Sequence, residues 1–124
     1  MSANTGVVIV VDDDEAVRAS MRFALELEGL DVRLYDGGAA LLAAGELPET
    51  GCLLIDQWMP GMEGVDLIAR LRERRVLLPV ILMTAKSTEE LRRRAGAAGA
   101  ELVVEKPFGD GVLMDGIHRA LAPR

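Results

Sequence analysis

The sequence predicts an α/β protein in which helices cover both faces of a parallel five-stranded sheet. Short apolar runs alternate with helical stretches along the chain, an order typical of parallel strands joined by crossover helices. Most of these runs are apolar at every position, which indicates strands buried on both faces. With 124 residues, half of them hydrophobic, the chain is long enough for one compact domain with an aliphatic core.

The expected strands divide into buried strands and an edge strand. The runs at 7–11, 52–55, 80–83 and 102–104 are apolar throughout and are expected to be buried on both faces. The stretch at 31–35 alternates polar and apolar residues, which is typical of a half-exposed edge strand. With this second strand of the sequence at the edge, the pattern fits the flavodoxin-like strand order 2-1-3-4-5. This fold is a three-layer sandwich with its ligand site at the C-terminal ends of the first and third strands.

Five helical stretches complete the alternation, at 14–28, 37–44, 64–74, 88–98 and 110–121. The apolar stripe of the first helix is formed by Val17, Met21, Ala24 and Leu25. Gly29 is a natural cap at the C-terminal end of this helix. The second helix is short and the fourth contains Gly96, so both are expected to be weaker than the others.

Composition excludes several classes of function. Twenty acidic and fourteen basic residues give a formal net charge of −6, so direct nucleic-acid binding by this chain is not expected. One cysteine and one histidine allow neither an internal disulfide nor a zinc ligand set. No apolar run reaches the roughly 18 residues of a membrane helix, and residues 1–6 do not resemble a signal peptide. We therefore expect a cytoplasmic protein without membrane contact.

Charged and hydroxyl side chains follow four of the expected strands. These are Asp12 and Asp13 after the first strand, Asp56 after the third, Thr84 after the fourth and Lys106 after the fifth. The ends of parallel strands share one edge, where two carboxylates roughly 5 Å apart repel by about 3 kcal/mol at an effective dielectric constant near 20. One ammonium cannot balance three carboxylates, so we predict a Mg²⁺ site and phosphoryl transfer to a nucleophilic carboxylate. No glycine-rich phosphate loop follows the first strand, so the phosphoryl group must come from a separate donor.

Four short motifs lie at these strand ends. They are Val-Asp-Asp-Asp-Glu at 11–15, Asp-x-x-Met-Pro-Gly-Met-x-Gly at 56–64, Thr-Ala at 84–85 and Glu-Lys-Pro-Phe at 105–108. In this order and spacing, from Val7 to about Leu121, they resemble the receiver domains of two-component response regulators, and the FixJ-like group in particular. We therefore expect residues 1–124 to be a single phosphoacceptor domain without an output domain.

The resemblance implies a role for each site residue. Asp56 is expected to accept a phosphoryl group from the phosphohistidine of a sensor histidine kinase or a histidine phosphotransfer protein. The implied Mg²⁺ ligands are Asp12, Asp13, Asp56 and the backbone carbonyl of Trp58. Thr84 and the backbone N–H of Ala85 are expected to hold phosphoryl oxygens. Lys106 is expected to pair with the phosphoryl group, beside a cis peptide bond to Pro107.

The resemblance also implies how the domain acts. It is expected to catalyse its own phosphorylation and dephosphorylation only, and to switch conformation so as to control a downstream partner or an output domain. Dimerisation through the fourth helix, fifth strand and fifth helix is a further expectation. Val103 stands where similar domains usually have an aromatic residue, which puts the usual output route in doubt. The indole of Trp58 is expected to shield the aspartyl phosphate from water and to slow autodephosphorylation.

Other interpretations remain open beside this one. A phosphatase of the HAD-like class also has an Asp-x-Asp motif after its first strand, but Ala16 replaces the usual Thr or Val, and the motif at 56–61 stays unexplained. A pseudo-receiver, which only binds partners, would lack the acid pair, the acceptor or the lysine, and all of these are present in this sequence. Asp14 and Glu15 are interpreted as helix-capping acids. The arginines at 70–75 and 92–94 are interpreted as exposed faces.

Overall fold

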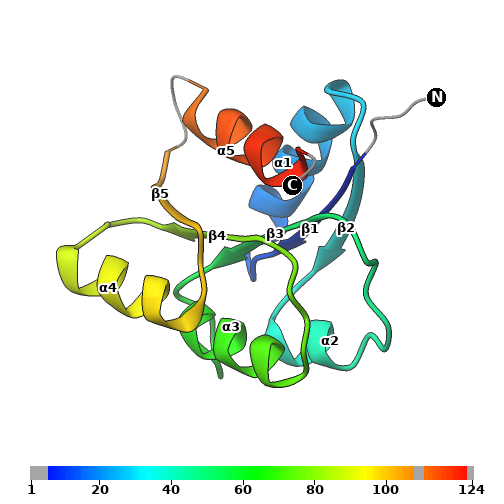
Figure 1. The fold of residues 1–124 in the computed structure, drawn as a ribbon. Helices are drawn as coiled ribbons and strands as arrows, with labels where there is room; N and C mark the ends of the chain where they lie inside the picture. The colour runs from blue at the N-terminus through cyan, green and yellow to red at the C-terminus, as the bar shows by residue number, and fades with distance from the viewer. Residues whose placement is uncertain (1–5, 108–110, 123–124) are drawn as a thin grey trace.

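The computed structural model describes residues 6–107 and 111–122, and these residues form a three-layer α/β sandwich (Figure 1). The strands are β1 (Val7–Val11), β2 (Asp31–Tyr35), β3 (Cys52–Asp56), β4 (Val80–Thr84) and β5 (Leu102–Glu105). All pair in parallel in one sheet of order β2-β1-β3-β4-β5. The predicted fold class and strand order are therefore confirmed. Phe108 of the fourth motif and residue 110 of the expected last helix lie outside the described residues.

The described helices cover both faces of the sheet. They are α1 (Glu15–Leu27), α2 (Gly38–Leu42), α3 (Gly64–Glu73), α4 (Glu89–Ala98) and α5 (Val112–Leu121). Figure 1 shows α1 and α5 on one face and α2, α3 and α4 on the other. Within the described ranges, no helix has both the length and the apolar composition that crossing a membrane requires.

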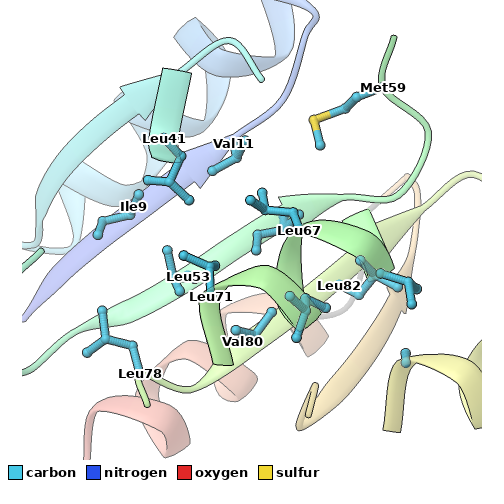
Figure 2. Close-up of a cluster of buried hydrophobic side chains, with 14 of the residues drawn as sticks. Ile9, Val11, Leu41, Leu53, Met59, Leu67, Leu71, Leu78, Val80 and Leu82 are labelled. Atoms are coloured by element: carbon cyan, nitrogen blue, oxygen red, sulfur yellow. The ribbon is translucent and has the colours of Figure 1, made fainter. Parts of the chain in front are cut away.

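Each inner strand supplies side chains to two cores, one on each face of the sheet. In β1, Ile9 and Val11 pack on the face covered by α2, α3 and α4, whereas Val8 and Val10 pack on the face covered by α1 and α5. Figure 2 shows the first of these cores, in which Ile9 and other strand residues pack around Leu67 and Leu71 of α3. This double burial is the physical reason why the inner strands are apolar throughout.

Two predictions about the burial of apolar residues are wrong. Ala24 is exposed, because the inward stripe of α1 is narrower than expected and buries Met21 and Leu25. The run at 102–104 is not buried on both faces, because β5 forms the second edge of the sheet. Its Leu102 is 36% exposed and Val103 is half buried.

Arg72 is not part of an exposed face, contrary to the prediction for the arginines at 70–75. Its guanidinium is half buried and donates through Nη1 to the carbonyls of Val76 (2.8 Å) and Leu78 (2.8 Å). Through Nη2 it donates to the carbonyl of Gly99 at 2.7 Å. Burial lowers the pKa of Arg72, an effect that the nearby Glu101 opposes. Arg72 therefore joins the end of α3, the segment before β4 and the end of α4.

Candidate functional site

The strand order brings the predicted site residues to one edge of the sheet. Asp56 is the last residue of β3, and Asp12 directly follows β1, its neighbour in the sheet. Thr84 ends β4, and Lys106 directly follows β5, with Thr84 and Glu105 paired in register. The sequence-based expectation that strand ends would gather these side chains is confirmed for the acidic residues and the lysine.

Three carboxylates form the acidic part of the site. Ligand oxygens of Asp12, Asp13 and Asp56 all lie within 4.8 Å of one another. Asp12 is fully buried, Asp56 is 6% exposed and Asp13 is exposed, so the cluster opens to solvent on the side of Asp13. Asp12 is held from two sides, because its Oδ1 accepts from the backbone N–H of Asp14 (2.9 Å) and its carbonyl accepts from Arg18 Nη1 (2.6 Å).

Lys106 provides the balancing ammonium. Its Nζ lies 3.1 Å from Asp12 Oδ2 and 3.2 Å from Asp56 Oδ1. Burial alone would lower the pKa of Lys106, but hydrogen bonding and attraction from Asp12 and Asp56 outweigh burial and raise this pKa. The peptide bond from Lys106 to Pro107 is cis, as expected.

The charge of the cluster is incompletely balanced. Burial and the neighbouring Asp12 raise the pKa of Asp56 to about 6, even though Lys106 acts in the opposite direction. Asp56 is therefore mostly ionised at neutral pH, when three carboxylates face the single ammonium of Lys106 in the described cluster. Closely spaced oxygen donors with excess negative charge are the ligand chemistry that suits a hard divalent cation. The donor set thus fits Mg²⁺.

The loop after β4 carries the predicted phosphoryl-binding groups. Thr84 is fully buried, and its hydroxyl donates to the carbonyl of Lys86 (3.2 Å) while accepting from the N–H of Lys86 (3.3 Å). Ala85 follows in an exposed position. Farther along this loop, the N–H of Ser87 donates to Glu105 Oε2 at 2.9 Å, which ties the loop to β5. Trp58, next but one after Asp56, is 55% exposed.

A family model described as "Response regulator receiver domain" matches residues 8–118. The chain belongs to this family. The receiver domain is therefore a signalling domain of two-component systems, and the family predicted from the four motifs is confirmed.

The receiver domain is similar to the transcriptional regulatory protein FixJ. It is 39% identical to FixJ of Azorhizobium caulinodans over 114 residues, which cover 92% of this chain and 54% of that protein. It is 36% identical to FixJ of Rhizobium meliloti over 113 residues, which cover 91% of this chain and 55% of that protein. The crystal structure of FixJ-N has a TM-score of 0.86 at 35% identity, covering 95% of this chain and 94% of that chain. The receiver domain thus spans about half the length of these curated relatives.

Sequence reasoning missed some residues that shape the site. Gln57 is fully buried, and its side chain bonds to the backbone N–H of Val65 and to Glu63. Arg18 holds the backbone of Asp12. The available signal for Gln57 was a polar residue between an apolar strand and the Met-Pro-Gly segment. No comparable signal existed for Arg18, because its partner is a backbone carbonyl. Asp14 was interpreted correctly, since it caps α1 through the N–H groups of Ala16 and Val17.

Proposed function

We propose that Asp56 accepts a phosphoryl group from the phosphohistidine of a sensor histidine kinase or a histidine phosphotransfer protein, in a Mg²⁺-dependent reaction. An Asp56 oxygen attacks phosphorus while the bond from phosphorus to the imidazole nitrogen breaks, and this nitrogen keeps the electron pair. Hydrolysis of the resulting acyl phosphate by water returns the carboxylate and inorganic phosphate. The Lys106 ammonium that bridges the carboxylates of Asp12 and Asp56, beside the cluster of three carboxylates, is the observation that carries this proposal.

Each proposed role uses a group in place at the edge of the sheet. Asp12, Asp13, Asp56 and the backbone carbonyl of Trp58 would hold Mg²⁺. When bound, Mg²⁺ would neutralise negative charge on the phosphoryl oxygens. Lys106 would transfer one contact from Asp56 to a phosphoryl oxygen. Thr84 would exchange its bond to Lys86 for another phosphoryl oxygen, beside the N–H of Ala85.

The proposed output is a change of conformation that controls a downstream protein or an output domain. The acyl phosphate carries close to two negative charges where the Asp56 carboxylate carried one, so phosphorylation adds about one negative charge to a cluster that already carries excess negative charge. Exposed Leu102 and Val112 support the expected dimerisation face of α4, β5 and α5. Val103 is half buried and packs against the core on the α3 side of the sheet. Its side chain is small and aliphatic, so a change of its rotamer can move few atoms on β5. The protein is proposed to act in the cytoplasm, without direct nucleic-acid binding by this chain.

The decisive experiment follows the fluorescence of Trp58 during a Mg²⁺ titration and then after addition of acetyl phosphate. We expect Mg²⁺ to change the emission, and acetyl phosphate to cause a further change together with one phosphoryl adduct per chain by mass spectrometry. Asp56→Asn should lose the adduct and the donor response. A wild-type chain that responds neither to Mg²⁺ nor to the donor would contradict the proposal.

Replacing Trp58 by alanine is expected to speed autodephosphorylation several-fold. The indole lies two residues after Asp56 and is half exposed, where it can screen the acyl phosphate from attacking water. Decay of the phosphorylated protein after removal of the donor measures the rate. Trp58→Phe is the control, because it keeps a large ring and should stay close to the wild-type rate. An unchanged rate in Trp58→Ala would show that the indole does not shield the phosphate.

A further inference from the structure

Gln57, the residue directly after Asp56, closes the loop that carries Trp58. Its backbone N–H donates to the carbonyl of Met83 (2.8 Å), which fixes the start of the loop to β4. Its carbonyl accepts from the N–H of Gly64 (2.9 Å), and its side-chain Oε1 accepts from the N–H of Val65 (3.0 Å). Gln57 therefore provides two of the acceptors that the N-terminus of α3 needs. The backbone and side chain of this one residue therefore fix both the start and the end of the loop of residues 57–64.

The close approach of α3 to this loop depends on Gly64. A Cβ atom at this position would lie 2.6 Å from the carbonyl oxygen of Asp56 and 2.7 Å from Leu82 Cδ1. Only glycine lets the first residue of α3 lie directly against the end of β3. The loop, the phosphoacceptor strand and α3 therefore form one tightly packed unit.

Glu63 extends this unit to α4. In the described chain its side chain makes no cap bond to α3, and its Oε1 instead accepts from two donors. These donors are Gln57 Nε2 at 3.0 Å and Arg94 Nη2 at 3.0 Å. The orientation of the Gln57 amide is fixed, because its oxygen faces the N–H of Val65 and its NH₂ must then face an acceptor. A polar chain thus runs from the residue beside the phosphoacceptor to α4.

The helix reached by this chain is weakly held by apolar packing. Among the residues of α4, all of which are described, Leu91 and Ala95 are buried. A helix with so few buried contacts can change position at low cost, so individual polar contacts have a large share in fixing it. Arg94 is one such contact, and it reaches the loop of residues 57–64 rather than β5.

We propose that Gln57, Glu63 and Arg94 couple the proposed metal site to the position of α4. Gln57 is a positioning residue that fixes the loop with the Trp58 carbonyl, and the Glu63–Arg94 bond links this loop to α4. The inference rests on the proposed function, because it requires a cation at Asp12, Asp13 and Asp56. Coupling between two sites is reciprocal. Mg²⁺ binding should therefore stabilise the position of α4, and removing a contact that holds α4 should weaken Mg²⁺ binding.

Arg94→Met tests the coupling, with Arg93→Met as the matched control. Arg93 is the neighbouring exposed arginine of α4, and the described part of the chain shows no hydrogen bond or ion pair for it. Both substitutions remove one positive charge from the same helix, so long-range attraction of Mg²⁺ changes alike in both. We expect the dissociation constant for Mg²⁺, measured by calorimetry on the full chain, to rise about threefold in Arg94→Met. In Arg93→Met it should match the wild type.

Amide hydrogen exchange of α4 provides the second readout, which a purely structural role of Arg94 would not produce. Saturating Mg²⁺ should slow exchange in Glu89–Ala98 in the wild type and in Arg93→Met, and this response should be absent in Arg94→Met. If both variants bind Mg²⁺ and protect α4 alike, the coupling is wrong while the metal site stands. If the wild type itself does not bind Mg²⁺, the coupling and the proposed function both fail.

Discussion

Replacing Asp56 by asparagine is expected to raise the free energy of unfolding of the metal-free protein by about 2 kcal/mol at pH 8. Burial and the neighbouring Asp12 raise the pKa of the Asp56 carboxyl group from 3.8 to about 6. The ionised carboxylate is therefore less stable in the folded chain than in the unfolded chain, although attraction by Lys106 offsets part of the difference. Asparagine has nearly the same shape without the charge, so it removes this destabilisation.

The pH dependence follows from the direction of the shift. Because the pKa of Asp56 is higher in the folded chain, the folded chain binds more protons between pH 3.8 and about 6. The destabilisation by Asp56 is complete above this window and disappears as the pH falls through it. The advantage of Asp56→Asn over the wild type should thus be full at pH 8 and lost near pH 4.

Urea unfolding followed by circular dichroism, in the presence of a chelator, measures this effect. Asp36→Asn is the matched control, since it makes the same chemical change at an exposed position. Its stability should follow that of the wild type at both pH values. Equal stabilities of the Asp56 and Asp36 variants at pH 8 would contradict the prediction.

Replacing Arg72 by methionine is expected to lower the free energy of unfolding by about 3 kcal/mol. The variant loses three charge-assisted hydrogen bonds and leaves the carbonyls of Val76, Leu78 and Gly99 without this donor. Methionine can refill much of the space occupied by the side chain, so the loss isolates the polar contribution. Gly99 packs so closely on Arg72 that a Cβ atom there would lie 2.7 Å from Nε.

Two further variants separate the guanidinium from the charge. Arg72→Lys keeps a positive charge but not the planar fork, and we expect it to lose most of the same stability. Arg70→Met removes an exposed arginine of α3 and should change the urea midpoint little. A midpoint for Arg72→Met equal to that of Arg70→Met would show that the three hydrogen bonds do not stabilise the fold.

The architecture was predictable because one physical rule decides it. A strand such as Val7–Val11 supplies side chains to the cores on both faces of the sheet, so it is apolar throughout. The helices that cover these faces must each have one apolar side, so they are amphipathic. The candidate site followed from the parallel arrangement that this double burial indicates. The C-terminal ends of parallel strands share one edge of the sheet, where Asp12, Asp56 and Lys106 meet. Where the rule weakens, at the second sheet edge, the prediction for Leu102 was wrong.

The unpredicted features depend on where backbone atoms converge. Arg72 stands in a run of charged residues and looks like a solvated position, and nothing in its neighbourhood in the sequence reveals three carbonyls within its reach. The same holds for Glu63, which occupies a helix start but bonds to Gln57 and Arg94 instead of capping the helix. Side chains that bond to distant backbone or to other loops leave no periodic signature.

The charged cluster is assembled from distant parts of the sequence. Lys106 and Asp12 are 94 positions apart in the sequence, yet their side chains lie 3.1 Å apart. A nascent chain that has not yet released β5 from the ribosome has its acidic residues but not the ammonium that holds them. β5, which follows the other strands of the sheet in the sequence, therefore completes the charged cluster only after its acidic residues have been synthesised.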